Sequence, residues 1–373
     1  MAANHFITTS RVSVPIHRVD VAAFTVPTEQ PESDGTLEWD HTTIVVVHAT
    51  AGDVTGLGYS YGDVAAAVLV EHLLAGVVTG LDALDVEGCY VAMTQAVRNV
   101  GRQGVAASAI SAVDAALWDL KARLLNVSLV ALLGGTREAI ALYGSGGFTS
   151  YSIDQLQTQL TGWVDGGIRA VKMKIGRDAA ADRERVRAVR QAIGPGVELF
   201  IDANGAYDRK QALAQADLFA AEGVSWFEEP VSSDDLEGLS LIRSRAPAGM
   251  EIAAGEYGYD VHYFRRMAEA RAVDVLQADA TRCCGITGLL RVGALCDAWC
   301  LPMSAHTAPS LHVHPCCAIS RMRNLEYFHD HVRLERLLFD GVLQPADGML
   351  QPDRSRPGFG IELKEREAER FAV

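Results

Sequence analysis

From about residue 136 onward, short apolar segments alternate with amphipathic helical segments, and this alternation constrains the fold more than any other feature. The first units are RAVKMKIG, DRERVRAVRQAIG, VELFIDANG, DRKQALAQADLFAAEG and VSWFEEP. The order continues through EIAAGE, AVDVLQAD, CLPMSAH and RNLEYF, and with ALYGS at the start it gives eight strands. Alternation of this kind predicts a parallel sheet that is covered by helices.

Eight such units within about 200 residues predict a closed barrel, which we assign to residues 136–335. An open doubly wound sheet is the alternative. It is disfavoured because no GxGxxG or GxxxxGKS/T loop, the phosphate-binding signals of such sheets, follows an early strand.

Residues 1–135 lack this alternation of strands and helices and predict a separate N-terminal α+β domain. Residues 14–61 are rich in β-branched and aromatic residues and predict an antiparallel meander, with VPTEQPESDG separating its first two strands. Residues 64–126 are helical in period, and we expect Asp114, Trp118 and Asp119 to form contacts between domains. The tail, residues 336–373, is rich in turns and is expected to pack back on this domain. The clearest helix carries one apolar stripe, formed by Ile110, Val113, Leu117, Leu120 and Leu124.

Composition excludes several classes of function. The formal net charge is 33 − 47 = −14, which argues against binding along a nucleic-acid backbone. No apolar stretch approaches the ~20 residues needed to cross a bilayer. The N-terminal segment does not resemble a signal peptide, and seven cysteines without a CxxC pair indicate a reducing compartment. We therefore expect a cytoplasmic protein that acts on neither nucleic acid nor membrane.

Polar side chains fall at the ends of the strands, at intervals of 20 to 30 residues. A buried apolar strand has no structural need for such residues. In a parallel barrel all strand C-termini emerge on one face, so we expect these side chains to converge there. The set comprises Lys172, Lys174, Asp202, Glu228, Glu256, Asp279, His306 and Glu326.

Three of these residues, Asp202, Glu228 and Glu256, are carboxylates that end consecutive strands. Converging anions raise one another's pKa values and repel unless a cation neutralises them. An oxygen-only set suits a hard divalent ion, Mg²⁺ before Mn²⁺, whereas zinc lacks its soft ligands here. The alternative is a structural cluster of salt bridges with arginines.

The remaining polar residues predict acid–base chemistry. Lys172 and Lys174 are two apart on one strand and so share a face. We expect each ammonium, beside the other and a divalent ion, to have a pKa lowered toward neutrality, which suits a general base. Asp279 and His306 end neighbouring strands and can form a second acid–base pair, while Glu326 is placed to hydrogen-bond a substrate oxygen.

The ordered elements VKMKIG, IDANG, WFEEP, AAGE, LQAD, MSAH and LEYF resemble the enolase superfamily, in particular its mandelate racemase subgroup. The resemblance implies a modified (β/α)7β-type TIM barrel with an N-terminal capping domain that forms a lid. It implies Mg²⁺ on the three carboxylates, Lys174 as general base with Lys172 as its helper, and Asp279 with His306 as the second pair. It further implies that the loop at 27–38 selects the substrate, that Ser145 contacts the substrate carboxylate, and that Asn204 orients the site.

The chain departs from this family where many relatives have a Gly-Gly pair after the sixth strand. Cys283 and Cys284 stand there and are interpreted as packing residues, while Arg282 beside them is a candidate contact for the substrate anion. Two pairs of histidines could be interpreted as metal ligands, but the three carboxylates already provide a metal site. Contact with substrate hydroxyls is an alternative role for either pair. They are His312 with His314 and His329 with His331.

These groups predict abstraction of the proton next to the carboxylate of a small-molecule acid, through an enediolate. The favoured activity is a lyase: dehydration of an acid sugar, an aldonate or aldarate, to a 2-keto-3-deoxy acid. The alternative is a racemase or epimerase of a 2-hydroxy acid. A cycloisomerase is disfavoured because relatives of that kind usually have a lysine where this chain has Asp279. A non-catalytic binding protein is the remaining class, and the family resemblance implies a homo-oligomer.

Overall fold

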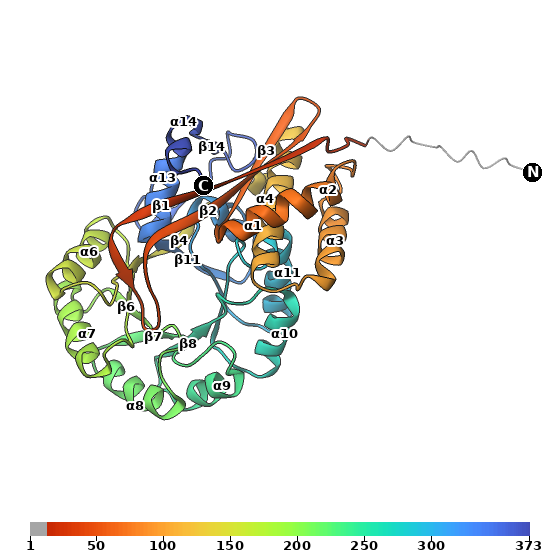
Figure 1. The fold of residues 1–373 in the computed structure, drawn as a ribbon. Coiled ribbons are helices and arrows are strands. Elements are labelled where there is room, and N and C mark those ends of the chain that lie inside the picture. The colour runs from red at the N-terminus through yellow and green to blue at the C-terminus, as the bar shows by residue number, and fades with distance from the viewer. Residues whose placement is uncertain (1–12) are drawn as a thin grey trace, which may run out of the picture.

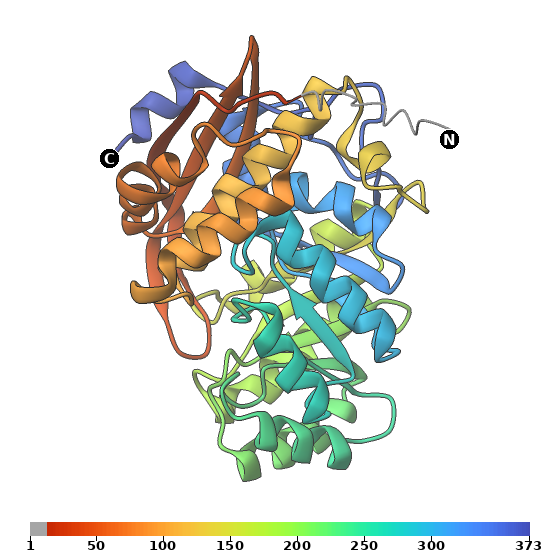
Figure 2. The same ribbon diagram turned by 90° about the vertical axis from the view of Figure 1, so that its right-hand side faces the viewer.

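The computed structural model describes residues 13–373. Residues 1–12 lie outside the described residues. The expectation that the chain has no signal peptide depends partly on them. The described chain forms a ring of strands and helices with a separate sheet and helices against one side (Figures 1 and 2). Within it, no helix is both long enough and apolar enough to traverse a bilayer.

An antiparallel sheet opens the described chain. It is formed by β1 (Arg18–Ser33), β2 (Glu38–Ala51) and β3 (Val54–Gly62), in the order β1-β2-β3. The meander is confirmed, but the prediction that VPTEQPESDG separates the first two strands is wrong in extent. β1 continues through it to Ser33, with a shift of register between Pro27 and Glu32. Because β1 is an edge strand, its prolines need not donate to a second neighbour.

Helices follow the sheet and pack on it. The longest, α4, lies directly on β3. A side chain at Gly58 would place Cβ 2.2 Å from the backbone nitrogen of Ala116, so this contact requires glycine. The predicted apolar stripe is buried as far as Leu120. The elements are α1 (Val64–Leu69), η1 (Val70–Leu74), α2 (Ala75–Val78), α3 (Val86–Ala96), η2 (Val97–Asn99), α4 (Val105–Leu124) and α5 (Leu129–Leu132).

Eight parallel strands then form the closed barrel that the sequence predicts. Each strand pairs with the next along the chain, and the last pairs with the first, so the sheet has no open edge within the ring (Figure 1). The strands are β4 (Ile140–Gly146), β5 (Ala170–Lys174), β6 (Glu198–Asp202), β7 (Val224–Glu228), β8 (Glu251–Ala254), β9 (Val275–Ala278), β10 (Met303–Ala305) and β11 (Met322–Phe328).

Helices surround the barrel and cover the outer face of its strands (Figure 1). They lie in the connections between successive strands, as the sequence alternation predicts. These helices are α6 (Ile153–Asp165), α7 (Ala179–Ile193), α8 (Arg209–Ala220), α9 (Leu236–Arg245), α10 (Val261–Glu269), α11 (Gly285–Ala298) and α12 (Pro309–Ala318).

Aromatic side chains fill the barrel interior. Tyr143, Phe200 and Trp226 are buried together, and the rings of Phe200 and Trp226 stack with centroids 4.9 Å apart. Side chains two residues apart on a strand share a face. Asp202 and Glu228, two residues beyond Phe200 and Trp226, therefore lie on the same inner face, one level nearer the C-terminal mouth.

The C-terminal segment returns to the N-terminal sheet. The backbone N–H of Phe359 donates to Asp119 on α4 at 2.7 Å, and that of Val373 donates to the carbonyl of Ala23 on β1 at 3.1 Å. β13 adds an antiparallel partner to β4. The elements are α13 (His329–Leu338), β12 (Phe339–Asp340), β13 (Met349–Leu350), β14 (Glu362–Leu363), α14 (Glu365–Ala368) and η3 (Glu369–Phe371).

Two contacts fix the N-terminal part on the barrel. On α4, Asp114 accepts from the backbone N–H of Thr287 at 2.9 Å, and Trp118 donates to the hydroxyl of Thr287 at 2.9 Å, so these two residues form the contact between domains that the sequence predicts. The β1–β2 hairpin reaches over the barrel mouth (Figures 1 and 2). At its tip a Cβ on Gly35 would lie 2.4 Å from the carbonyl oxygen of Ala203, which only glycine avoids.

Candidate metal and acid–base site

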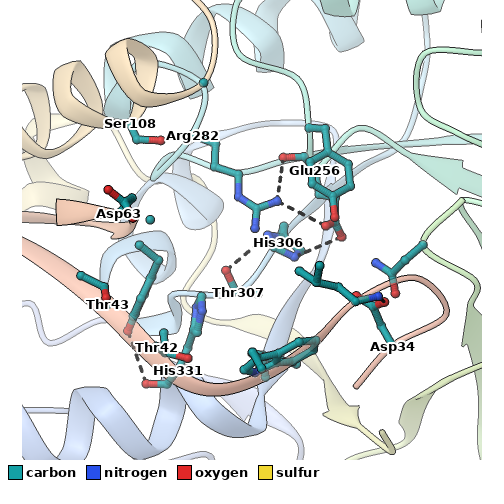
Figure 3. Close-up of a pocket in the computed structure, with 18 of the residues that line it drawn as sticks. Asp34, Thr42, Thr43, Asp63, Ser108, Glu256, Arg282, His306, Thr307 and His331 are labelled. Carbon is teal, nitrogen blue, oxygen red and sulfur yellow. Dashed lines mark hydrogen bonds and ion pairs between the residues drawn. The ribbon is translucent and has the colours of Figure 1, made fainter. Parts of the chain in front are cut away.

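A pocket of about 560 Å³ lies between the β1–β2 hairpin and the barrel mouth (Figure 3). Lys174, Glu256 and His306 line it from the strand ends of the barrel, and Asp34 and Thr43 line it from the hairpin. Four of the strand-end residues that the sequence singles out therefore line one cavity, which the N-terminal sheet covers; they are Lys174, Glu256, His306 and Glu326.

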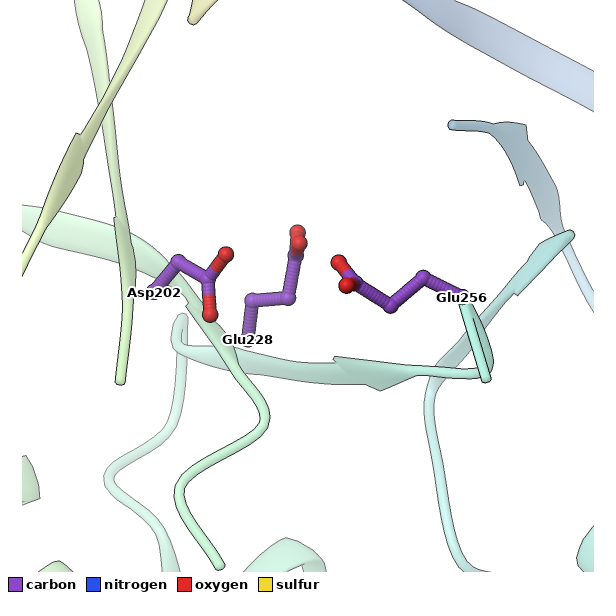
Figure 4. A group of neighbouring side chains, drawn as sticks. All are labelled: Asp202, Glu228 and Glu256. Carbon is purple, nitrogen blue, oxygen red and sulfur yellow. The ribbon is translucent and has the colours of Figure 1, made fainter. Parts of the chain in front are cut away.

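The three predicted metal ligands lie together. Asp202 ends β6, Glu228 ends β7, and Glu256 follows β8 by two residues. Each is buried and offers one carboxylate oxygen, and these oxygens lie within 4.8 Å of one another (Figure 4). In residues 13–373 this is the group of acidic, histidine or cysteine side chains that is arranged to hold a metal ion.

The protonation of these acids reflects their crowding. Burial raises the pKa of Glu228 to about 8, an effect that Lys172 only partly offsets. Burial also acts on Glu256, but the nearby His306 and Arg282 outweigh it and hold the pKa of that carboxyl well below its usual range. A donor set of hard oxygens that repel one another fits a divalent cation such as Mg²⁺, which would replace this repulsion by coordination.

Both lysines project from β5 into the acid cluster. The Nζ of Lys172 lies 2.5 Å from Glu228 and 2.9 Å from Glu326. The Nζ of Lys174 lies 2.6 Å from Asp202. Each of the two ammonium groups is therefore held by carboxylates from other strands of the barrel.

The sequence predicts lowered pKa values for the two lysines beside a divalent ion, whereas among the protein groups alone both pKa values are raised. Burial lowers both pKa values, but the surrounding carboxylates outweigh it, so the pKa of Lys172 lies well above its usual range and that of Lys174 is also raised. The same carboxylates that would bind the cation hold the two ammonium groups here.

The predicted histidine–aspartate pair is formed. His306 follows β10, and its Nδ1 lies 2.8 Å from the Oδ2 of Asp279, which follows β9. Its Nε2 faces Glu256 at 3.2 Å. Burial lowers the pKa of His306, but Glu256 and Glu326 outweigh it and raise that pKa to about 9. The imidazole is thus oriented by one carboxylate while its other nitrogen faces the acid cluster.

Two further predicted residues lie at the same site. Glu326, on β11, contacts Lys172 and also lies 3.7 Å from the Nε2 of His306, and it lines the pocket. Arg282 lines the pocket and donates to Glu256, its Nη1 lying 3.2 Å from both the backbone carbonyl and Oε1. Arg282 therefore neutralises an acid of the triad in this arrangement.

The two weaker candidates have different positions. Asn204 lines the pocket, and its backbone N–H donates to Asp202 at 2.9 Å, with a left-handed φ of 46°. Ser145 is fully buried on β4 in register with Lys172 and is not among the residues that line the pocket. Ser145 could therefore contact a substrate only if the residues around it moved.

Sequence reasoning missed the groups that hold Glu228. Trp226 and Gln277 donate to its Oε2 at 3.0 and 3.2 Å, which leaves Oε1 for Lys172. It also missed Glu229, the second acid of the EEP segment, which is buried with a left-handed φ of 39°. The doubled glutamate was the available signal for Glu229, whereas nothing in the linear sequence marks Trp226 or Gln277.

The other cysteines and histidines that the sequence singled out have structural contacts. Cys283 and Cys284 are buried, and burial raises the pKa of both thiols, as expected for packing residues. His312 accepts from the backbone of Ala280, and His314 accepts from that of Val130. His329 pairs with Glu29 at 3.6 Å, and His331 lines the pocket.

Lys174 and His306 lie at opposite ends of the acid triad. The three acids form a row with Glu228 in the middle (Figure 4). Lys174 contacts Asp202 at one end of this row, and His306 contacts Glu256 at the other. The two ionisable groups thus lie on either side of the triad, Lys174 on β5 and His306 after β10. The arrangement can therefore move a proton from one side and supply or accept one on the other.

Comparisons with known proteins agree with this geometry. Residues 18–134 match the mandelate racemase / muconate lactonizing enzyme N-terminal domain, and residues 155–368 match the family described as enolase C-terminal domain-like. The chain is 31% identical over 365 residues to a 3,6-anhydro-alpha-L-galactonate cycloisomerase of Streptomyces coelicolor, covering 95% of this chain and 98% of that protein.

Solved structures give the same result. A mandelate racemase/muconate lactonizing enzyme-like protein from Rubrobacter xylanophilus is 55% identical with a TM-score of 0.94, covering 96% of this chain and all of that one. An L-talarate/galactarate dehydratase from Salmonella typhimurium, liganded with Mg and L-lyxarohydroxamate, is 28% identical with a TM-score of 0.91, covering 100% of this chain and 96% of that one. The chain therefore belongs to the mandelate racemase/muconate lactonizing enzyme family of the enolase superfamily.

Proposed function

We propose that the protein is a Mg²⁺-dependent acid-sugar dehydratase, which converts a 2,3-dihydroxy acid into a 2-keto-3-deoxy acid and water. The observation that carries this proposal is the placement of Lys174 and His306 at the two ends of the acid triad, inside one pocket. Elimination of water needs a base at the α-carbon and an acid at the departing hydroxyl, and these are two separately positioned groups.

Lys174 is the base in this proposal. It removes the α-proton, and the electron pair moves into the carboxylate to give an enediolate. Lys172, whose ammonium lies among Asp202, Glu228 and Glu326, remains protonated and stabilises the negative charge that develops. Mg²⁺ on the triad would supply further positive charge to the carboxylate and would draw the acids away from Lys174, which lowers its proton affinity.

His306 is the acid. Asp279 holds its Nδ1, so Nε2 is the nitrogen that faces the cluster and carries the transferable proton. That proton passes to the 3-hydroxyl as the C3–O bond breaks, and the electron pair of the enediolate forms the C2–C3 double bond. The resulting enol takes a proton at C3 and becomes the 2-keto acid, so the balance is loss of one water.

A cycloisomerase is the second candidate, because a cycloisomerase is among the similar proteins. The comparisons therefore give no support to the expectation that Asp279 disfavours this activity. Both reactions begin with removal of the α-proton, and they differ in the bond that breaks next: a hydroxyl leaves in dehydration, whereas a ring oxygen leaves in cycloisomerisation. A racemase would return the proton to the opposite face of the α-carbon.

The test is a screen of the purified protein with Mg²⁺ against a library of mono- and diacid sugars and their anhydro and lactone forms. A carbonyl reagent detects the 2-keto product. Formation of a 2-keto-3-deoxy acid from an open-chain acid, lost on EDTA addition, is the expected result. Turnover of lactones or anhydro acids alone favours the cycloisomerase, and α-deuteration in D₂O without a 2-keto product favours the racemase. Turnover that does not depend on metal contradicts the proposal.

A further inference from the structure

Glu228 is the middle acid of the triad, and two side-chain donors meet on its Oε2 (Figure 4). The indole Nε1 of Trp226 donates to Oε2 at 3.0 Å, and the amide Nε2 of Gln277 donates to it at 3.2 Å. A carboxylate oxygen has two lone pairs. Because an N–H group is directed at each of them, Oε2 has no lone pair left for a metal ion.

The other oxygen of Glu228 is different. The Nζ of Lys172 donates to Oε1 at 2.5 Å, and this donor occupies one of its two lone pairs. The second lone pair of Oε1 can bind a cation. Glu228 can therefore coordinate an ion through one oxygen, whereas coordination through both would break the hydrogen bonds from Trp226 and Gln277.

The two outer acids of the triad are held in a similar way. The Oδ1 of Asp202 accepts from the backbone N–H of Asn204 at 2.9 Å, and the Oε1 of Glu256 accepts from Arg282 at 3.2 Å. A protein donor thus occupies one oxygen of each acid, and the group that is arranged to hold a metal ion takes one oxygen from each. The site offers three single carboxylate oxygens.

The two donors to Glu228 are themselves fixed in the barrel interior. Trp226 on β7 and Gln277 on β9 have no exposed surface. The ring of Trp226 stacks on that of Phe200 with centroids 4.9 Å apart, and the Nε2 of Gln277 also donates to the hydroxyl of Tyr143 at 3.0 Å. If Oε2 turned toward an ion, both N–H groups would lose a buried acceptor, which is unfavourable.

Single oxygens and paired oxygens suit different cations. Mg²⁺ is small, requires nearly octahedral geometry, and binds to one or two carboxylates together with water or substrate oxygens. Ca²⁺ is larger, takes six to eight oxygens, and often binds both oxygens of one carboxylate. A site that holds each carboxylate to one oxygen therefore disfavours Ca²⁺ relative to Mg²⁺.

We infer that Trp226 and Gln277 restrict Glu228 to one metal-binding oxygen and thereby bias the site toward Mg²⁺ over Ca²⁺. Both are positioning residues, which act on the ion through Glu228. The inference rests on the metal site of the proposed function, and it holds for any reaction that this site performs.

The experiment measures the Kd of Mg²⁺ and of Ca²⁺ by calorimetry, in protein that has been treated with EDTA and dialysed. Q277M and W226F each remove one N–H donor and keep a side chain of similar shape. In each variant we expect the Kd of Mg²⁺ to rise about tenfold and the ratio of the Ca²⁺ Kd to the Mg²⁺ Kd to fall about threefold or more. S225A is the control, because Ser225 lies on the same strand with its side chain on the outer face, and it should change neither Kd.

The ratio distinguishes positioning of Glu228 from a general structural role, which would weaken the binding of both ions by the same factor. An equal change for both ions in folded Q277M, or no change for either, overturns the inference. Circular dichroism checks the fold, and Q277M alone decides if W226F does not fold. Failure of Mg²⁺ to bind the unmodified protein overturns the inference together with the metal site.

The outcome for the reaction is separate. A fall in the ratio, in a protein that forms no 2-keto product from any acid, supports the inference and contradicts the dehydratase. An unchanged ratio, in a protein that forms this product only with Mg²⁺, refutes the inference while the dehydratase stands.

Discussion

Glu335 is a buried carboxyl that joins the N-terminal sheet to the barrel, and its replacement by glutamine should change how stability depends on pH. It lies on α13 with no exposed surface. The hydroxyl of Tyr59 on β3 donates to it at 2.5 Å, and the backbone N–H and hydroxyl of Ser310 on α12 donate at 3.1 and 2.7 Å. Burial outweighs these hydrogen bonds and raises the pKa of Glu335 to about 7 from its ordinary 4.5.

The sign follows from proton binding. Between pH 4.5 and 7 the folded protein keeps a proton on Glu335 that the unfolded chain has released, so stability falls as pH rises through this window. A shift of about 2.5 pKa units corresponds to roughly 3 kcal/mol in full, and to roughly 2 to 3 kcal/mol between pH 5 and 8. Glutamine cannot titrate, so E335Q should lack this contribution to the pH dependence.

Urea unfolding followed by tryptophan fluorescence at pH 5 and pH 8, at constant ionic strength, measures the effect. The free energy of unfolding of E335Q should lose less on going from pH 5 to pH 8 than that of the unmodified protein, by the amount above. E367Q, at an exposed glutamate on α14, should follow the unmodified protein and serves as the control. Parallel pH profiles for E335Q and the unmodified protein would refute this account of Glu335.

Three further changes test other contacts. G35A should push the hairpin off the barrel mouth and lower kcat/KM by roughly tenfold or more, since a Cβ there lies 2.4 Å from a barrel carbonyl. G76A, with open space around its Cβ, should leave kcat/KM unchanged. Equal activity of the two variants would contradict a lid role for the hairpin. T287V leaves the indole N–H of Trp118 without its partner and should cost about 1 to 3 kcal/mol in urea unfolding. Mg²⁺ at a hundred times its Kd should stabilise the protein by about 2.7 kcal/mol in thermal melts. D202N should largely lose that shift, and an unchanged shift would place the ion elsewhere.

The barrel and its converging strand ends were predictable because both depend on short-range periodicity. Asp202 and Glu228 each end a five-residue apolar strand, and the two-residue period of strands puts them above Phe200 and Trp226 on the inner face. Once eight strands are assigned, closure of the barrel brings these ends together without any knowledge of long-range contacts.

Properties that depend on several groups in contact were not predictable in this way. The raised pKa of Lys172 follows from Glu228 and Glu326, on two other strands, approaching within 3 Å. The sequence indicated that these groups converge but not which ones pair. The support of Glu228 by Gln277 likewise depends on a pairing across the barrel that no local pattern encodes.

The N-terminal hairpin was the hardest segment to predict. Prolines and charges in PTEQPES are typical of a loop, yet an edge strand accepts them, and β1 continues through this segment to Ser33. The position of Gly35 on the barrel mouth is a tertiary contact, visible only when the two parts of the chain are placed together.

The central claim is that Lys174 takes the α-proton and His306 completes the elimination. The most direct test is proton exchange at the α-carbon in D₂O with Mg²⁺ and the acid that turns over best, in K174A and H306N side by side. The account predicts that H306N incorporates deuterium at the α-carbon without forming 2-keto product, and that K174A does neither while keeping its fold by circular dichroism. α-Proton exchange or product formation at the normal rate in K174A would contradict it.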